Sequence, residues 1–184
     1  MLPKIGNSFL TAVVDRLGSL ADQYQVVVVV GGGSPVDELR QQCQAGQLAN
    51  DIAHERALDI MDFHARLYAK SIAGAVLLSS WKKLDDEPAS VVFLEVSADI
   101  RRDADVPVGW DVTSDSIAAF IAIKLRADRL ILFKSVGTSG SFDPEVACQR
   151  GWIDRHFPKL VFPLVETGCQ SEWFNARQAS DRDG

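Results

Sequence analysis

The chain has 184 residues, of which 47% are hydrophobic and 24% charged, and its formal net charge is −6. This length fits one domain in which helices cover both faces of a sheet, and the composition is that of a globular rather than a disordered protein. The negative charge argues against nonspecific nucleic-acid binding, which needs clustered lysine and arginine. No apolar run is long enough to cross a bilayer, and no signal peptide is recognisable at the start. We therefore expect a cytoplasmic protein that binds neither membranes nor nucleic acid.

Helical and strand patterns alternate along the chain. Apolar residues recur at helical spacing over 8–24, and the five valines at 26–30 predict a strand buried on both faces. Further elements are expected in this order: a short helix at 34–43, a long helix at 53–72 that could continue toward residue 78, a strand at 91–94, a helix at 113–125, and strands at 130–133 and, more weakly, 160–165. This alternation predicts a three-layer αβα sandwich with a mainly parallel central sheet. We expect a single domain over residues 1–174 and a disordered polar tail over 175–184.

The junction after the valine run is the first candidate binding site. Gly31, Gly32 and Gly33 follow the strand directly, which leaves backbone N–H groups that no side chain covers. Ser34 is placed to cap the next helix, and Pro35 suits a first helical turn. A strand, a glycine turn and a helix N-terminus together favour binding of phosphate or another anion. A tight turn without a ligand is the structural alternative.

A second candidate site lies at residues 110–116, Trp-Asp-Val-Thr-Ser-Asp-Ser. Thr113 or Ser114 can cap the helix that follows, and Asp115 suits the positive end of its dipole. That is the structural interpretation. In the functional one, Asp115 lies near the carboxyl edge of the sheet, where open α/β folds bind ligands. A carboxylate there can orient lysines or a magnesium ion around a phosphate.

These segments carry a resemblance to a known family. The glycines at 31–33, the run Val-Thr-Ser-Asp-Ser-Ile-Ala-Ala at 112–119 and Ala-Asp-Arg-Leu-Ile-Leu at 127–132 resemble the amino acid kinase family. Lys-Ile-Gly-Asn-Ser at 4–8 is similar to the family's opening Lys-x-Gly-Gly-Ser. Arg40, Ala53-His54 and the stretch from Trp110 to Asp115 most resemble a small archaeal-type branch. The characterised activity of that branch is aminomethyl-furanmethanol phosphate kinase, a step of methanofuran biosynthesis. The resemblance spans about residues 4–136.

The resemblance implies a role for each matching residue. Lys4 corresponds to the lysine that stabilises the transferring phosphoryl group, and Asp115 to the aspartate that positions the catalytic lysines. Residues expected at the nucleotide are Gly6, Asn7, Ser8, Lys134, Ser135 and Gly137. Residues expected at the acceptor are Gly31, Gly32, Gly33, Arg40, His54, Trp110, Thr113 and Ser114. The cofactors implied are ATP and Mg²⁺, with no metal held by the protein alone. A homodimer or higher homo-oligomer is also implied, formed through the helix at 53–72 or the one at 10–24.

The chain departs from the family pattern at three points. Asn7 replaces the second glycine of the opening loop. Lys-Ser-Val-Gly-Thr at 134–138 stands where the family has Thr-Asp-x-Asp-Gly. The C-terminal segment that brings a second catalytic lysine is not recognisable, and either Lys134 or Lys159 can take that part. Two functions follow: an ATP-dependent kinase for a phosphate or carboxylate acceptor, or a homologue without catalysis that binds a ligand or a partner. Uridylate kinase is the less favoured kinase branch because this chain is short for it.

Overall fold

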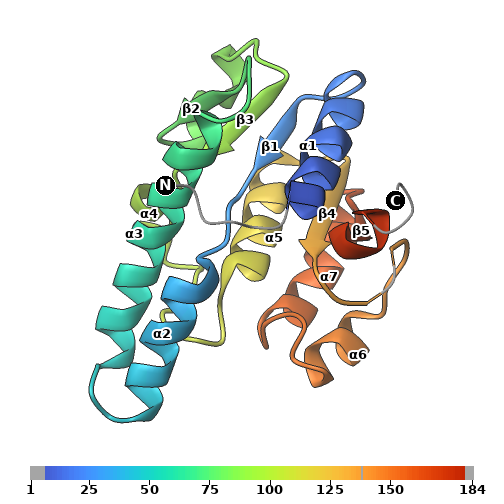
Figure 1. The fold of residues 1–184 in the computed structure, drawn as a ribbon. Coiled ribbons are helices and arrows are strands. Elements are labelled where there is room, and N and C mark those ends of the chain that lie inside the picture. The colour runs from blue at the N-terminus through green and yellow to red at the C-terminus, as the bar shows by residue number, and fades with distance from the viewer. Residues whose placement is uncertain (1–6, 138, 181–184) are drawn as a thin grey trace.

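The computed structural model describes residues 7–137 and 139–180 (Figure 1). Five strands alternate with helices in this region. The strands are β1 (Val26–Val28), β2 (Val76–Leu78), β3 (Val91–Leu94), β4 (Arg129–Lys134) and β5 (Gln170–Asn175). The helices are α1 (Asn7–Ala21), α2 (Gly33–Gln44), α3 (Asn50–Ala69), α4 (Ser97–Ile100), α5 (Ser114–Leu125), α6 (Pro144–Gln149), α7 (Phe157–Glu166) and α8 (Ala176–Ser180), with a 3-10 helix at Trp81–Asp86.

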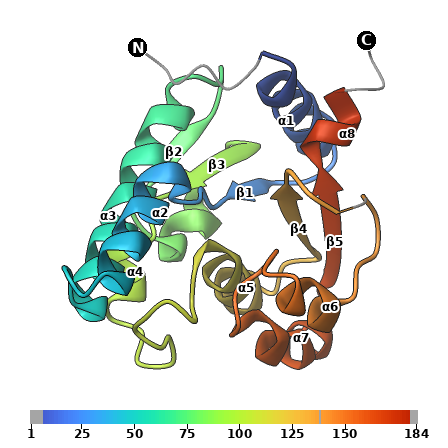
Figure 2. The same ribbon diagram turned by 60° about the horizontal axis from the view of Figure 1, so that its bottom comes forward.

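The strands form two parallel groups, ordered β1-β3-β2 and β4-β5. Val27 pairs with Val92 in the first group, and Leu132 pairs with Trp173 in the second. Helices α1 and α8 lie on one face of the strands, and α5 and α7 lie on the other (Figure 2). This arrangement confirms the predicted αβα sandwich with parallel strands. Strands β1 and β4 are the neighbouring edges of the two groups, and both line an apolar cavity of about 630 Å³, which α1 and α5 also border.

Helix α5 joins two hydrophobic cores. Ile117 and Ile121 pack with β3, α3 and α4, and Ala119 and Ala122 pack with β4, α7 and the buried Trp173. Burial of each large apolar side chain contributes about 1.5–3 kcal/mol. The two cores therefore fix α5 from both sides, and its N-terminus is held at the carboxyl edge of the sheet.

The valine run is less buried than its sequence predicts. Strand β1 ends at Val28, and all five valines at 26–30 are half-buried. The valines stay half-buried because β1 pairs with β3 along one edge only. Along its other edge, β1 borders the apolar cavity.

The strand predicted at 160–165 is wrong, because these residues belong to helix α7. Phe157, Leu160 and Leu164 recur at helical spacing and are buried. Pro158 is in the first turn, where a missing N–H costs nothing. The strand of this region is β5, in which the buried Trp173 follows three polar residues, Gln170, Ser171 and Glu172.

The other differences concern where elements end. Helix α3 stops at Ala69, and residues 76–78 form β2 instead of continuing the helix. The tail expected to be disordered from residue 175 is ordered through residue 180. Asn175 is buried, and its side-chain oxygen accepts hydrogen bonds from the N–H groups of Arg177 and Gln178 at the start of α8. Helix α8 in turn packs on α1. Residues 181–184 lie outside the described part of the chain.

Candidate active site

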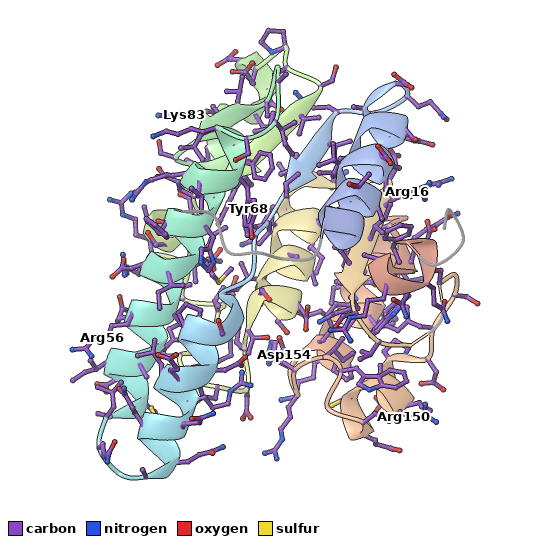
Figure 3. The ribbon with its side chains drawn as sticks, in the orientation of Figure 1. Arg16, Arg56, Tyr68, Lys83, Arg150 and Asp154 are labelled. Carbon is purple, nitrogen blue, oxygen red and sulfur yellow. The ribbon has the colours of Figure 1, made fainter. Side chains whose placement is uncertain are left out.

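A polar cleft of about 840 Å³ opens at the carboxyl ends of β1 and β4. Its walls come from both halves of the chain. One wall is the glycine turn with α2 and the start of α3, and the other is formed by residues 110–115, Lys134 and residues 148–155. Asp154 lies at the lower end of α5 in the view of Figure 3, which is the N-terminal end of that helix. This position matches the ligand-binding edge of open α/β folds.

The glycine turn starts α2 without a side-chain cap. Gly32 is the N-cap, and no side chain accepts a hydrogen bond there. A Cβ atom on Gly32 would lie 2.0 Å from Cγ2 of Val36, and Gly33 has a φ of +59°, so both positions require glycine. The helix begins one residue before Ser34, which makes the predicted Ser34 cap wrong. The first-turn N–H groups therefore remain available at the cleft.

Gly31 lies at the boundary between the cleft and the apolar cavity. It lines the cavity rather than the cleft, unlike the two glycines that follow it. Its carbonyl oxygen accepts a hydrogen bond from Nδ1 of His64 at 3.0 Å. A Cβ atom on Gly31 would lie 3.2 Å from Oγ of Ser114, so the glycine turn and the start of α5 are in close contact.

Asp115 and Lys134 form an ion pair in the cleft wall. The Nζ atom of Lys134 donates to both carboxylate oxygens of Asp115, each at 2.7 Å. The side chains are only 12% and 19% exposed, respectively. Burial raises the pKa of Asp115, and the positive charge of Lys134 opposes that shift. A buried lysine held in this way presents a fixed positive charge at the cleft.

Asp154 caps the helix that carries Asp115. Thr113 is the N-cap of α5 but makes no side-chain cap of its own. Instead, Oδ2 of Asp154 accepts from the N–H of Thr113 at 2.9 Å and from the N–H of Ser116 at 3.0 Å. Thr113 thus holds the predicted N-cap position, but the capping hydrogen bonds are accepted by a carboxylate about forty residues away and not by the side chain of Thr113 or Ser114.

Arg40, Trp110 and His54 all line the cleft. The guanidinium carbon of Arg40 lies 5.0 Å from the ring centre of Trp110, a cation–π contact. Within the described residues, Nε1 of Trp110 is buried and has no hydrogen-bond partner. Nδ1 of His54 accepts from the N–H of Gly109 at 3.3 Å, which places the ring proton on Nε2. Burial lowers the pKa of His54, so this ring is neutral at physiological pH.

The structure brings most, but not all, of the predicted site residues together. The cleft is lined by Gly32, Gly33, Arg40, His54, Trp110, Thr113, Ser114, Asp115 and Lys134. Ser135 and Gly137 are in the loop after β4 and do not line the cleft; the carbonyl of Gly137 accepts from the side chain of Asn175 at 2.7 Å. Lys4 and Gly6 lie outside the described residues, while Asn7 and Ser8 are the first residues of α1.

The structure also separates the two candidates for a second lysine. Lys134 reaches Asp115 from the end of β4. Lys159 lies on α7 and is not among the cleft-lining residues. Sequence reasoning missed Asp154, although an acidic residue shortly before Phe157-Pro158 is typical of a helix start.

Comparisons with known proteins identify the family and the fold of the chain. The sequence pattern of the amino acid kinase family matches residues 3–138, about three quarters of the chain. The chain therefore belongs to the amino acid kinase family. Uridylate kinase from Archaeoglobus fulgidus has a similar fold, with a TM-score of 0.67 over 98% of this chain and 90% of that protein, at 18% sequence identity. No curated protein sequence matches the chain significantly. None of the described helices is long and apolar enough to cross a membrane.

Proposed function

We propose that the protein is an ATP-dependent kinase that transfers a phosphoryl group to a phosphate or carboxylate of a small molecule. The observation that carries this proposal is the pair of Lys134 and Asp115 at the carboxyl edge of the sheet, in a cleft that also contains the glycine turn. Phosphoryl transfer depends on positioning and on cationic stabilisation of charge spread over the phosphoryl oxygens. A lysine fixed by a buried carboxylate supplies that kind of charge.

Each side of the cleft has a function in this proposal. Lys134 takes the part of the second catalytic lysine, Lys4 supplies the first, and Asp115 organises them. On the acceptor side, the first-turn N–H groups of α2 bind an anionic group, and the guanidinium of Arg40 adds a positive charge. For the nucleotide, the resemblance implies Asn7 and Ser8 at the start of α1, and Ser135 and Gly137 in the loop that follows Lys134.

The site suits a magnesium ion that arrives with the nucleotide. In the described part of the chain, no group of three or more His, Cys, Asp or Glu residues could hold a metal ion. Kinases commonly bind Mg²⁺ through substrate phosphates with only one or two carboxylates. Asp37 and Asp111 are exposed carboxylates in the cleft lining that can supply such contacts. When bound, the ion would neutralise charge on the transferred phosphates.

For the acceptor, we propose aminomethyl-furanmethanol phosphate, whose monophosphate would become a diphosphate. Support comes from the sequence resemblance of Arg40, His54 and residues 110–115, all of which line one cleft. The contact between Arg40 and Trp110 places a cation beside a flat aromatic surface, which suits a small ring that carries a phosphate.

Two measurements test the proposal. Thermal unfolding with millimolar ATP and Mg²⁺ should show a clear rise in Tm, because a ligand that binds the folded state stabilises it. A coupled assay of ADP formation should then show turnover with the furan monophosphate and none with Asp115→Asn. Turnover with uridine monophosphate instead would keep the kinase and replace the acceptor. No Tm shift and no turnover with any phosphate or carboxylate acceptor would favour a homologue that binds a ligand without catalysis.

A further inference from the structure

We propose that Asp154 is a positioning residue that holds Ser114 and Asp115 in the catalytic cleft by tying together the N-termini of two helices. This inference deepens the proposed function and rests on it. Asp154 lies in the segment between α6 and α7, outside the motifs that resemble the family, and it is 9% exposed.

The carboxylate of Asp154 accepts six hydrogen bonds. Oδ2 accepts from the backbone and the hydroxyl of Thr113, both at 2.9 Å, and from the N–H of Ser116 at 3.0 Å. Oδ1 accepts from the hydroxyl of Ser116 at 2.5 Å and from the N–H groups of His156 and Phe157 at 3.1 and 3.0 Å. Four donors come from the start of α5 and two from the start of α7. One carboxylate thus accepts two backbone N–H groups at the start of each helix.

Asp154 forms hydrogen bonds with the residues on both sides of Ser114 and Asp115. Thr113 and Ser116 stand on either side of Ser114 and Asp115, so fixing the outer pair sets the direction of the inner pair. A further contact restrains the same segment, because the N–H of His156 also donates to the carbonyl oxygen of Asp111 at 3.0 Å. A displacement of about 1 Å at such a position can reduce turnover about 10²-fold.

Asp154 also acts on Asp115 electrostatically. Among residues 7–137 and 139–180, the charged groups that act on Asp115 are Lys134, from the end of β4, and Asp154. The negative charge of Asp154 raises the pKa of Asp115, whereas Lys134 lowers it. Removal of the Asp154 charge should therefore make Asp115 ionise at lower pH. A buried carboxylate that caps a helix far from Asp115 would leave this titration unchanged.

The chain contains a matched control for this residue. Asp62 on α3 is 5% exposed and caps the start of α4, where Oδ1 accepts from the N–H groups of Val96 and Ser97 at 2.7 and 3.1 Å. The hydroxyl of Ser97 donates to its other oxygen. Asp62 is thus a buried carboxylate that caps a helix with the same kinds of donor, but it does not line the cleft.

The experiment compares Asp154→Asn with Asp62→Asn in the full chain. Each substitution places an amide N–H₂ against N–H donors, so both variants should lose thermal stability. Only Asp154→Asn should lower kcat, by roughly 10–10²-fold at nearly constant KM for ATP, with the assay temperature kept well below both Tm values. Equal losses of kcat in the two variants would overturn the proposal.

A second readout needs no enzymatic turnover. Carbon-13 NMR of labelled aspartate carboxyls, with the Asp115 signal assigned from Asp115→Asn, should show the Asp115 titration at lower pH in Asp154→Asn and unchanged in Asp62→Asn. If Asp154→Asn does not fold, Ser116→Ala can replace it as the test variant, because it removes one hydrogen-bond donor and keeps the Asp154 carboxylate. Ser116→Ala should lower kcat by a smaller factor than Asp154→Asn. An unmoved Asp115 titration in Asp154→Asn, or unaltered kcat in an active Ser116→Ala, contradicts the positioning role. A shifted titration in a protein without turnover supports the role of Asp154 and overturns the proposed kinase function instead.

Discussion

Lys134 and Asp115 meet because α5 runs antiparallel to β4 and leads directly into it. The N-terminus of α5 therefore lies beside the carboxyl end of β4, and residues 19 apart in sequence form a bidentate ion pair with both distances at 2.7 Å. The two hydrophobic cores that hold α5 keep this geometry in place. A cation is thus fixed at the sheet edge in this chain even though the acidic pair typical of the family after this strand is missing.

The ion pair should behave as a unit. Lys134→Met and Asp115→Asn should each lower kcat by roughly 10²–10³-fold, as loss of one transition-state group commonly does. The double variant should lose little more than either single variant, because residues that act together are not additive. Each single variant should also lower the free energy of unfolding by up to about 3 kcal/mol, since the remaining partner is left buried without its counter-charge. Steady-state kinetics and urea unfolding of the three variants measure these effects. Unchanged turnover in Asp115→Asn would show that this residue has only a structural role.

Lys4 should matter for catalysis but not for stability. Lys4→Ala is expected to lower kcat by about 10²–10³-fold, because it removes positive charge from the transferring phosphoryl group. Its Tm should stay close to that of the parent protein, because Lys4 is expected to act on the phosphoryl group and not to pack in the core. Lys70→Ala is the control: Lys70 is exposed and does not line the cleft. Equal kinetics in the two variants would remove Lys4 from the site.

The glycine turn is tested by a pair of glycine variants. Gly33 and Gly46 have φ angles of +59° and +70°, so an alanine at either position should cost roughly 1–2 kcal/mol of stability. Only Gly33 lines the cleft. Gly33→Ala should therefore also raise KM for the acceptor, because the N–H groups that bind its anion move. Gly46→Ala should leave KM unchanged. An equal KM in both variants would make the glycine turn a purely structural feature.

Stability should fall on mild acidification because of His54. The folded protein lowers the pKa of this buried ring, whereas the unfolded chain has the ordinary value of about 6.5. Below that pH the unfolded state binds a proton that the folded state does not, so the free energy of unfolding decreases as pH falls. Chemical unfolding at several values between pH 7.5 and 5 should show this loss, and His54→Asn should reduce the slope. Parallel pH profiles for the two proteins would contradict the assignment.

We also expect a homodimer formed through α3. Ile52 and Phe63 are 46% and 58% exposed. Because they are eleven residues apart, about three helical turns, they lie on nearly the same side of the helix. Arg56 points outward from α3 (Figure 3). Two copies of one helix can cover these apolar side chains across a twofold axis. Light scattering at high micromolar concentration should give a dimer mass for the parent protein and a monomer for Phe63→Lys. A monomeric parent would exclude this interface.

Local patterns in the sequence determined the elements that surround the site. The apolar run at 91–94 has the bounds of β3, and the helical spacing that follows Thr113 predicts α5 to within one residue. The glycine run marked a turn that admits no side chain at Gly32, and Asp115 was recognised as a candidate from its place in the first turn of α5. These features depend on neighbours within a few residues, so periodicity and turn chemistry are enough to find them.

Contacts between distant segments decided which charged residues meet in the site and how some apolar runs fold. Lys134 and Lys159 are equivalent candidates in sequence, and only the packing of α5 against β4 places the first of them on Asp115. Asp154 was not predicted because it caps a helix that starts about forty residues earlier. The apolar run at 160–165 predicts a strand, but a short run of this kind does not distinguish a strand from a buried helix. The tertiary structure alone determines which partner accepts a hydrogen bond from a buried donor. It also determines which face of an apolar run is covered.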